Sequence, residues 1–250
     1  MEHYVEKNLE VINGWCVNGW EWSVPVSHEE YEKAKVGRYQ IYLTPTKVIP
    51  AEWLKDIKGK KVLALASGGG QQGPILTALG AGVTVMDFSA EQIKREREVQ
   101  QREGYHIEII QADMTKPFPF EIDTFDMIVH PVSNIFVRDV LPIWKECYRV
   151  LKQGGTLMAG LDNGINYIVD EREREIVNAL PFDPLENGAH YQLCMENNEG
   201  FQFSHSIEEQ IGGQLKAGFA LLDIYGDTNR TGRLSELNVP LYWATLSRKM

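Results

Sequence analysis

Residues 62–73 read VLALASGGGQQG, and this stretch decides the fold. The apolar run that begins at Lys61 and ends at Ala66 predicts a short buried strand, because glycines flank it on both sides. A helix is expected over 72–79, ended by Gly80. Glycine between a strand and a helix lets the backbone approach a ligand closely and leaves the amides of the helix N-terminus free. The stretch therefore predicts a strand–loop–helix unit that lies against a ligand.

The glycine spacing alone does not identify that ligand. Gly68, Gly70 and Gly73 satisfy the dinucleotide fingerprint G-x-G-x-x-G. Two interpretations stay open: a nicotinamide or flavin enzyme, or an enzyme that uses another nucleoside cofactor. Asp87, at the end of the next predicted strand, suits both, since a carboxylate there accepts hydrogen bonds from both ribose hydroxyls. It also suits a structural role, as an acid that stabilises the N-terminus of the helix beginning at Ser89.

Strands and helices alternate downstream of this unit. Strands are expected over 83–86, 107–111, 125–130 and 156–159, and helices over 89–103 and 140–151, the second ended by Gly154 and Gly155. Such alternation with short connections predicts a parallel, doubly wound sheet.

The last part of the chain is expected to supply the strands at one edge of the sheet. Ser206 and Glu209 form a capping box for a helix that ends near Gly218. Strands follow over 219–225 and 241–247, and they should pair antiparallel because their connection is short and contains no helix. The sequence thus predicts an α/β fold with a Rossmann-like doubly wound sheet of about seven strands, mostly parallel with an antiparallel last strand.

Composition and the pattern of expected strands and helices divide the chain into four segments of a single domain. Residues 1–58 are rich in aromatic side chains and form an N-terminal cap, whereas 59–161 form the cofactor-binding core. Residues 162–205 are a lid insertion, and 206–250 supply the helix and the strand pair that complete the sheet.

Secondary-structure signals in the cap and the lid are weaker than those in the core. Ser27 and Glu30 form a capping box, which predicts a helix that begins near His28. The remaining expectations are a helix over 170–180, a loop over 181–200, and two charged runs on solvent-facing helix surfaces, 94–98 and 170–175.

The composition excludes several classes of protein. The net charge is -10, and so acidic a surface repels nucleic acid phosphates. No apolar run approaches the roughly 20 residues of a membrane span, and the N-terminus lacks the pattern of a secretory signal. Cys16, Cys147 and Cys194 lack metal-type spacing and predict reduced thiols. These features predict a cytoplasmic protein that binds neither nucleic acid nor membrane, and they predict no oligomeric state.

Asp113 decides between the two cofactor interpretations. It closes the third predicted strand in QADM, and four further motifs stand in order around it: VLALASGGG, VMDFS, PF…FDMIV and RVLKQGGTL. With this set the chain resembles the class I S-adenosylmethionine-dependent methyltransferases over about residues 59–161, in particular the small-molecule branch that includes ubiquinone and sterol methyltransferases. Nicotinamide enzymes do not usually combine the glycine loop with this aspartate and a Gly-Gly hairpin before the fifth strand.

The resemblance implies S-adenosylmethionine as the cofactor, S-adenosylhomocysteine as the product, and a role for each strand end. Asp87 would bind the ribose, and Asp113 would accept the adenine amino group. Beside the methionine part of the cofactor, the resemblance implies Ala66, Ser67, Gly68 and Gly70. At the ribose and the adenine it implies Asp87, Phe88 and Gln92. It adds Asp113 and Met114 at the adenine and His130 near the sulfonium.

Two positions depart from the family pattern. The family usually has an acidic residue at the position of Ala64 and a glycine at the position of Ala66. The acid normally supports the loop or the ammonium group of the cofactor, so its loss removes a polar anchor. The amides of Gln71 and Gln72 either supply the missing hydrogen bonds or face solvent, and the sequence leaves both possibilities open.

No catalytic residue and no metal site are predicted. A methyl sulfonium is a strong electrophile, so the enzyme mainly aligns a nucleophile and excludes water. A base is required only where the nucleophile arrives protonated. His130, His190 and His205 are candidate bases, although histidines at such positions are more often structural.

The sequence as a whole predicts methyl transfer from S-adenosylmethionine to a small-molecule acceptor by in-line displacement. Residues 130–134 lack the Asn/Asp-Pro-Pro-Tyr/Phe pattern of enzymes that methylate amides and base nitrogens. The alternatives are an NAD(P)-binding oxidoreductase and a non-catalytic regulatory protein that binds S-adenosylmethionine. In the cap, the following aromatic residues form either an apolar or cation-binding pocket or, as we favour for most of them, the core of the cap itself: Trp15, Trp20, Trp22 and Tyr39.

Overall fold

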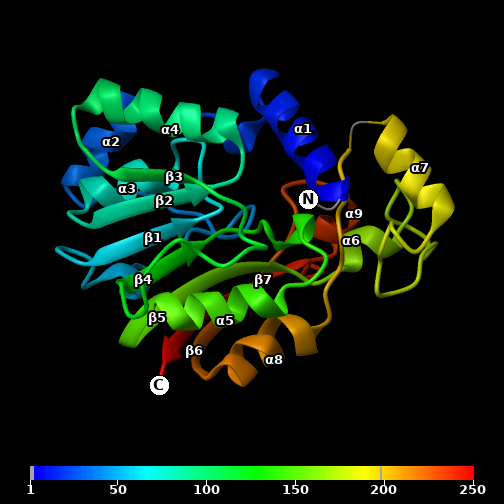
Figure 1. The fold of residues 1–250 in the computed structure, drawn as a ribbon. Coiled ribbons are helices and arrows are strands. Elements are labelled where there is room, and N and C mark those ends of the chain that lie inside the picture. Colours follow the sequence, from blue (N-terminus) through cyan, green and yellow to red (C-terminus); the bar gives the residue numbers. More distant parts are fainter. Residues whose placement is uncertain (1–2, 198) are drawn as a thin grey trace.

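A computed structural model describes residues 3–197 and 199–250 and shows one sheet flanked by helices (Figure 1). The strands are β1 (Lys61–Leu65), β2 (Gly82–Asp87), β3 (Glu108–Gln111), β4 (Phe125–His130), β5 (Leu151–Asp162), β6 (Phe219–Asp227) and β7 (Tyr242–Lys249). Within the described residues they form a seven-stranded sheet in the order β3-β2-β1-β4-β5-β7-β6. β7 runs antiparallel to β5 and β6, and the other pairs are parallel. The predicted fold is confirmed.

The strand order reverses at β1 and β4, which are hydrogen-bonded neighbours although β2 and β3 separate them along the chain. The connections that leave these two strands run in opposite directions, so a crevice opens at their carboxyl ends. Along β1, Val62 and Ala64 face one side of the sheet, and Leu63 and Leu65 face the other. Both sides are covered, which is why β1 reads as a continuous apolar run.

The helices are α1 (His3–Val17), α2 (His28–Lys35), α3 (Gln72–Ala78), α4 (Ala90–Glu103), α5 (Leu141–Val150), α6 (Ile165–Ile168), α7 (Gly188–Glu196), α8 (Ile207–Ala217) and α9 (Arg233–Glu236). Short 3₁₀ turns lie at Glu21–Ser23, Ala51–Leu54 and Asn134–Phe136. Helices α5 and α8 cover one face of the sheet, whereas α3 and α4, with α2 outside them, cover the other (Figure 1). Part of the cap joins the second face, because Leu43 and Trp53 pack into its core.

Helix α1 was not predicted, and it connects the cap to the lid. It lies beside α7 (Figure 1), and Tyr4 and Val5 pack with Phe201 in a separate apolar cluster. The buried side chain of Asn8 donates to the backbone carbonyls of Phe136 (3.2 Å) and Phe201 (2.9 Å). It also accepts the N–H of Phe201 (2.6 Å). Cap and lid are therefore joined to the segment that follows β4.

The predicted helix over 170–180 is wrong. Val169 and Ile176 form an isolated antiparallel bridge there. The carboxylate of Asp170 accepts the backbone N–H groups four and five residues later, at 2.7 and 3.0 Å. An aspartate that bonds to nearby backbone in this way favours a turn over a helix. The charged run 170–175 is thus a turn and not a helix surface.

Other boundaries also differ from the predictions. The predicted loop over 181–200 contains α7, which begins after the N-cap Asn187, and residue 198 lies outside the described residues. Helix α5 ends at Val150, and Gly154 and Gly155 lie inside the longer strand β5, where the pairing with β4 is irregular. The connection from β6 to β7, expected to contain no helix, holds the short helix α9.

Several local predictions are confirmed. Ser27 and Ser206 each form a reciprocal capping box. The cysteines are free thiols, and all are buried. Among the described helices, none is long and apolar enough to cross a membrane. The cytoplasmic location stays a prediction.

Candidate active site

A cavity of about 410 Å³ lies at the carboxyl ends of the strands, and we call it the strand-end cavity. Its lining includes Ala66 after β1, Asp87 at the end of β2, Pro131 after β4 and Asp162 at the end of β5, together with residues of α1. Doubly wound sheets bind their ligands at this place, and the volume is within the usual range for small-molecule sites.

Most of the residues predicted to bind the cofactor line this cavity. They are Ala66, Ser67, Gly68, Asp87, Phe88, Gln92, Asp113 and Met114. Gly70 and His130 are not part of the lining.

Ala66, where the family usually has a glycine, takes a backbone conformation that favours glycine. Its φ is 46°, in the left-handed region, which costs an L-residue roughly 1–2 kcal/mol. The N–H of Ala66 donates to the carbonyl of Met86 at 2.7 Å, so the turn is held against β2. The strained conformation of Ala66 is therefore held by a hydrogen bond to β2.

Asp87 holds the loop and faces the cavity. Its carboxylate accepts the backbone N–H groups of Gly68 (3.0 Å) and Ser89 (2.9 Å). Burial raises the pKa of Asp87, and these N–H groups oppose the rise. Each carboxylate oxygen has a further lone pair, so the side chain fits a pair of ribose hydroxyls. A Cβ atom on Gly68 would lie 3.0 Å from Asp87 Oδ2 and 2.8 Å from Gln92 Cβ, so this approach needs glycine.

Asp113 presents an acceptor atom that has no partner within the described residues. Its Oδ1 accepts the N–H of Thr115 at 2.8 Å, whereas Oδ2 is buried and unpaired. A buried unpaired acceptor is costly unless a ligand satisfies it. Phe88 and Met114 line the cavity beside it. These residues fit an adenine ring with its exocyclic amino group.

Glu96 supports the glycine loop, and the sequence analysis missed it. We expected the run 94–98 on a solvent-facing surface, but Glu96 is fully buried, so that prediction is wrong there. Its Oε2 accepts the N–H of Gly70 at 2.9 Å. Burial raises its pKa to about 8. Ala64, where the family has its acid, is also buried, within an apolar cluster. A second acid that holds the loop, besides Asp87, therefore comes from α4, and β1 supplies none.

His130 lies outside the lining of the strand-end cavity, whereas the resemblance implies a contact near the sulfonium. It is fully buried. Its Nδ1 lies 3.0 Å from the carbonyl oxygen of Leu65, and its Nε2 lies 2.6 Å from the side-chain oxygen of Asn134. Desolvation lowers the pKa of the imidazole, and these two oxygens oppose the fall. With both nitrogens engaged away from the cavity, His130 is not a suitable base.

The other two candidate histidines also lie outside the lining of the cavity. The ring of His190 packs against Phe182, with centroids 4.9 Å apart. His205 is buried, and its Nε2 bonds to the carbonyl of Val137 at 2.8 Å. Burial lowers its pKa. Neither is placed to take a proton from a ligand in the cavity.

The amides of Gln71 and Gln72 bond to protein, which answers the question that the sequence left open. Gln71 donates to the carbonyls of Glu21 (2.9 Å) and Val24 (3.0 Å). Gln72 is buried, and its Oε1 accepts the hydroxyl of Ser67 at 3.0 Å. Both glutamines line the cavity. They join the glycine loop to the cap.

The four cap aromatics do not form a core of their own, so the role favoured for most of them is wrong. Trp20 and Trp22 line the strand-end cavity. Trp15 stacks at an angle on Trp20, with centroids 5.2 Å apart, and also contacts Phe136. Tyr39 packs against the core on one face of the sheet. Half of the set therefore lines the strand-end cavity.

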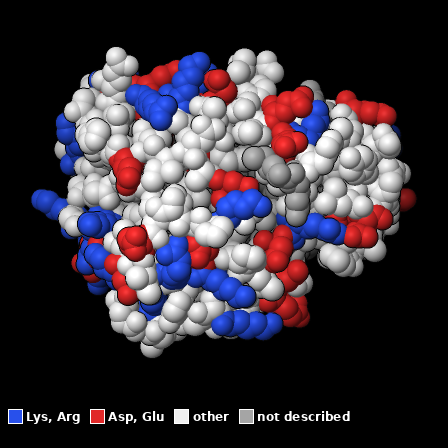
Figure 2. All heavy atoms as spheres, viewed as in Figure 1, with Lys and Arg blue, Asp and Glu red and all other residues white. Residues whose placement is uncertain are grey.

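Charges are mixed on the face seen in Figure 2, where Lys and Arg are interspersed with Asp and Glu and form no continuous basic patch. The lining of the strand-end cavity contains Asp87, Asp113 and Asp162 but, among the described residues, no Lys, Arg or His. Phosphate groups therefore find no counter-charge in the cavity.

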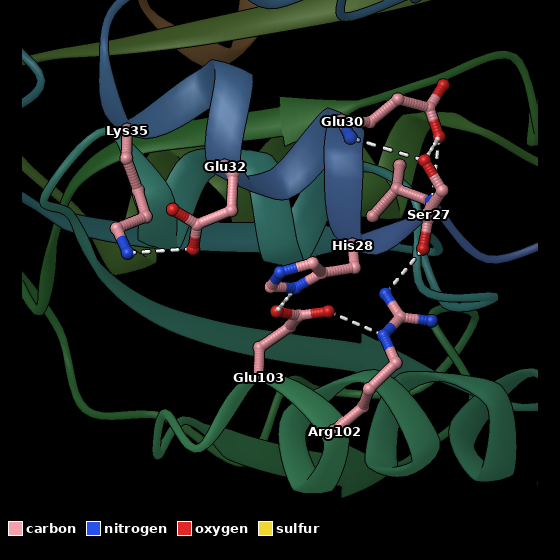
Figure 3. Close-up of polar contacts among 8 residues, drawn as sticks. Ser27, His28, Glu30, Glu32, Lys35, Arg102 and Glu103 are labelled. Atoms are coloured by element: carbon pink, nitrogen blue, oxygen red, sulfur yellow. Dashed lines mark hydrogen bonds and ion pairs between the residues drawn. The ribbon is translucent and has the colours of Figure 1, made fainter.

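A further cluster could hold a metal ion by its residue types. It consists of His28, Glu32 and Glu103, whose potential ligand atoms all lie within 4.8 Å of one another. Figure 3 shows that the carboxylate of Glu103 lies between His28 and Arg102. Desolvation opposes ionisation of Glu103, but hydrogen bonds from Arg102 and His28 lower its pKa. The cluster is accounted for as an ion-pair contact between α2 and the end of α4.

Comparison with known proteins agrees with the geometry. A model of the methyltransferase domain matches residues 63–159. The chain is 43% identical to the uncharacterized methyltransferase YbaJ of Bacillus subtilis (strain 168), and the match covers 100% of both chains.

Solved structures share the fold. An S-adenosylmethionine-dependent methyltransferase from Mesorhizobium loti gives a TM-score of 0.63 at 18% identity, covering 79% of this chain and 94% of that chain. A SAM-dependent methyltransferase from Methanosarcina mazei gives 0.58 at 17% identity, covering 82% and 99%.

These comparisons give no support to a nicotinamide oxidoreductase, and membership of the ubiquinone and sterol branch stays a prediction. The family model spans the strand-end motifs, and the relative aligns from end to end. The chain therefore belongs to the class I S-adenosylmethionine-dependent methyltransferases, with S-adenosylmethionine as its cofactor.

Proposed function

We propose that this enzyme methylates a small-molecule acceptor that binds in the strand-end cavity beside the cofactor. One observation carries the proposal: the residues suited to adenosine occupy the β2–β3 side of the cavity, while the β5 side is lined by Asp162, Tyr167 and Tyr242, which have no part in the cofactor assignment. A single cavity thus has one wall suited to the cofactor and another wall left for an acceptor.

We assign the cofactor contacts from the acceptor atoms in the cavity that can still accept a hydrogen bond. S-adenosylmethionine, when bound, supplies an electrophilic methyl group on its sulfonium. Asp87 accepts the ribose hydroxyls, and Asp113 accepts the adenine amino group through its unpaired Oδ2. Gln92 also carries a buried, unpaired Oε1 beside the loop. The remaining contacts in this proposal are Phe88 and Met114 at the ring, and Ala66, Ser67 and Gly68 beside the methionine part.

Gly70 and His130 act indirectly in this proposal. Gly70 is held by Glu96, and His130 holds the end of β1 through the carbonyl of Leu65. Both therefore position the loop without contact with the cofactor.

The cap and the lid close the cavity. Asn8 of α1 lines it and bonds to both the lid and the segment after β4. Walls of this kind exclude water and orient an acceptor, which are the main requirements for methyl transfer. A nucleic acid acceptor is disfavoured by the net charge of -10 and by the lack of basic side chains in the described lining.

Transfer of a radioactive methyl group tests the proposal. The protein is incubated with S-adenosylmethionine labelled in the methyl group and with a cell extract separated into small molecules, proteins and nucleic acids. Label is expected in the small-molecule fraction, and Asp87→Ala should abolish it. Label in the protein or nucleic acid fraction would overturn the small-molecule assignment, and binding without transfer to any fraction would favour the regulatory alternative.

A further inference from the structure

A hydrogen-bonded cluster of four residues lies on the β5 side of the strand-end cavity. It consists of Asp162 at the end of β5, Asn166 in α6, Asn229 between β6 and β7, and Tyr242 at the start of β7. We call it the Asp162 cluster. All four residues line the cavity, and none has a role in the cofactor assignment.

Hydrogen bonds fix the cluster in one arrangement. Asp162 accepts the N–H of Gly164 (2.6 Å) and the side-chain NH₂ of Asn166 (3.0 Å), one on each carboxylate oxygen. The same NH₂ lies 3.1 Å from the Tyr242 hydroxyl, which donates to Asn229 Oδ1 at 2.9 Å. Asn229 donates back to Asn166 Oδ1 at 3.0 Å. Each oxygen of Asp162 still has a lone pair for a ligand.

Burial makes Asp162 a stronger base than an ordinary aspartate. Only 3% of the residue is exposed, and desolvation raises its pKa to about 6, against the hydrogen bonds from Asn166 and Gly164. The phenols of Tyr167 and Tyr242 face it, and burial together with the Asp162 charge raises the pKa of both. At neutral pH Asp162 is therefore ionised while both phenols keep their protons, which suits it to accept a proton.

The charge of the cavity selects the acceptor. Its lining holds three aspartates and, among the residues described, no basic side chain. A carboxylate or phosphate on the acceptor would be buried beside like charge, which is unfavourable. An amine or a hydroxyl would instead donate to Asp162. The apolar wall made by Trp20, Trp22 and Phe136 suits a hydrophobic body.

We propose that the Asp162 cluster is the acceptor subsite, that it takes an apolar alcohol or amine, and that the Asp162 carboxylate is the catalytic base. This rests on the proposed function. The O–H or N–H bond of the acceptor breaks, the proton moves to a carboxylate oxygen of Asp162, and the electron pair stays on the acceptor oxygen or nitrogen as the nucleophile. Asn166 and Tyr242 hold the carboxylate in position.

Three probes that share one ring and differ in their head group test the charge selection. They are 2-phenylethylamine, 2-phenylethanol and phenylacetate, each titrated by calorimetry into full-length protein saturated with S-adenosylhomocysteine. The amine is expected to bind at least tenfold more tightly than phenylacetate, with the alcohol in between. The affinity of the amine should fall as the pH is lowered from about 7.5 to about 5, because Asp162 takes up a proton, whereas that of the alcohol should not.

Asp162→Asn then identifies the residue. It should lower the affinity for 2-phenylethylamine at least tenfold and abolish the pH dependence. Asp56→Asn makes the same change in net charge at an exposed position outside the cavity lining and should change neither. Retained binding of S-adenosylhomocysteine shows that a variant is folded, and the probe series on the unaltered protein needs no variant.

The outcomes separate this inference from the proposed function. Failure of the unaltered protein to bind S-adenosylhomocysteine would count against the cofactor assignment. Normal binding of S-adenosylhomocysteine, with phenylacetate as tight as the amine or with Asp162→Asn without effect on the amine, would overturn the acceptor subsite alone.

Discussion

The carbonyl oxygen of Leu43 occupies the space that a Cβ atom on Gly160 would need: the two positions are 2.0 Å apart. The same carbonyl accepts the N–H of Val132 at 3.0 Å. Through Leu43, the cap thus packs directly against β5 and hydrogen-bonds to the segment after β4. The neighbours of Leu43, Tyr42 and Thr44, line the strand-end cavity. A glycine in the sheet therefore lets the cap form one wall of the site.

Gly160→Ala should displace this segment of the cap. Because overpacking a tight contact typically costs about 1–3 kcal/mol, the free energy of unfolding in urea should fall by that amount. The affinity for S-adenosylhomocysteine should fall with it. Gly212→Ala in α8 is the control, since its new Cβ would meet nothing closer than 3.8 Å, and alanine should stabilise a helix by roughly 0.5–1 kcal/mol. Equal stability of the two variants would show that the contact with Leu43 is dispensable.

Asp87→Ala should abolish cofactor binding while the fold survives. A charge-assisted hydrogen bond is worth about 1.5–3 kcal/mol, and Asp87 is proposed to accept two from the ribose, so the affinity for S-adenosylhomocysteine should fall at least about 100-fold. Isothermal titration measures the affinity, and circular dichroism at rising temperature checks that a cooperative unfolding transition remains. Unchanged affinity would make the ribose assignment wrong.

Asp113→Ala should change which base the protein accepts. The unpaired Oδ2 of Asp113 is suited to an amino group, so the unaltered protein should bind S-adenosylhomocysteine at least about tenfold more tightly than S-inosylhomocysteine, which has a carbonyl at that place. In the variant the two affinities should become similar. A preference for the adenine form that persists in Asp113→Ala would show that another group reads the base.

The positions of Asp87 and Asp113 could be predicted because each follows a strand that the sequence shows clearly. Apolar runs bounded by glycine or by a capping signal locate the strands, and the carboxyl ends of parallel strands share one edge of the sheet. Ala66 could be predicted for the same reason. The fold class then predicts that the strand order reverses between β1 and β4. A ligand cavity is expected at the carboxyl ends of the strands where the order reverses.

Glu96 and the Asp162 cluster could not be predicted in this way. Every residue in 94–98 is charged, so no contrast in polarity distinguishes the one side chain that α4 turns toward the glycine loop. The Asp162 cluster joins positions up to 80 residues apart, from Asp162 to Tyr242, and depends on how β7 inserts beside β5. Helix α1 did leave a signal. Its buried positions Tyr4, Val5, Asn8, Val11 and Ile12 have helical spacing, but the polar Asn8 in their midst conceals the stripe.

Glu96 should make the protein less stable as the pH rises. Its pKa is raised by burial from 4.5 to about 8, so the folded chain holds this proton more tightly than the unfolded chain. Its contribution to stability is full below the unfolded pKa and is lost as the pH rises through the folded pKa. A difference of this size corresponds to roughly 5 kcal/mol once the carboxyl is ionised. Glu96→Gln keeps the shape of the side chain and the acceptor for Gly70, and it has no proton to lose.

Urea unfolding at pH 5 and at pH 9 measures this effect. The unaltered protein and Glu96→Gln should have similar free energies of unfolding at pH 5, and the variant should be more stable by several kcal/mol at pH 9. The difference reports the Glu96 carboxyl together with its electrostatic coupling to Asp87. Glu98→Gln, at an exposed ion pair on the same helix, should shift either value by less than about 1 kcal/mol. Parallel pH profiles for the unaltered protein and Glu96→Gln would mean that the carboxylate is already ionised at pH 5, with the N–H of Gly70 stabilising the charge more than burial opposes it.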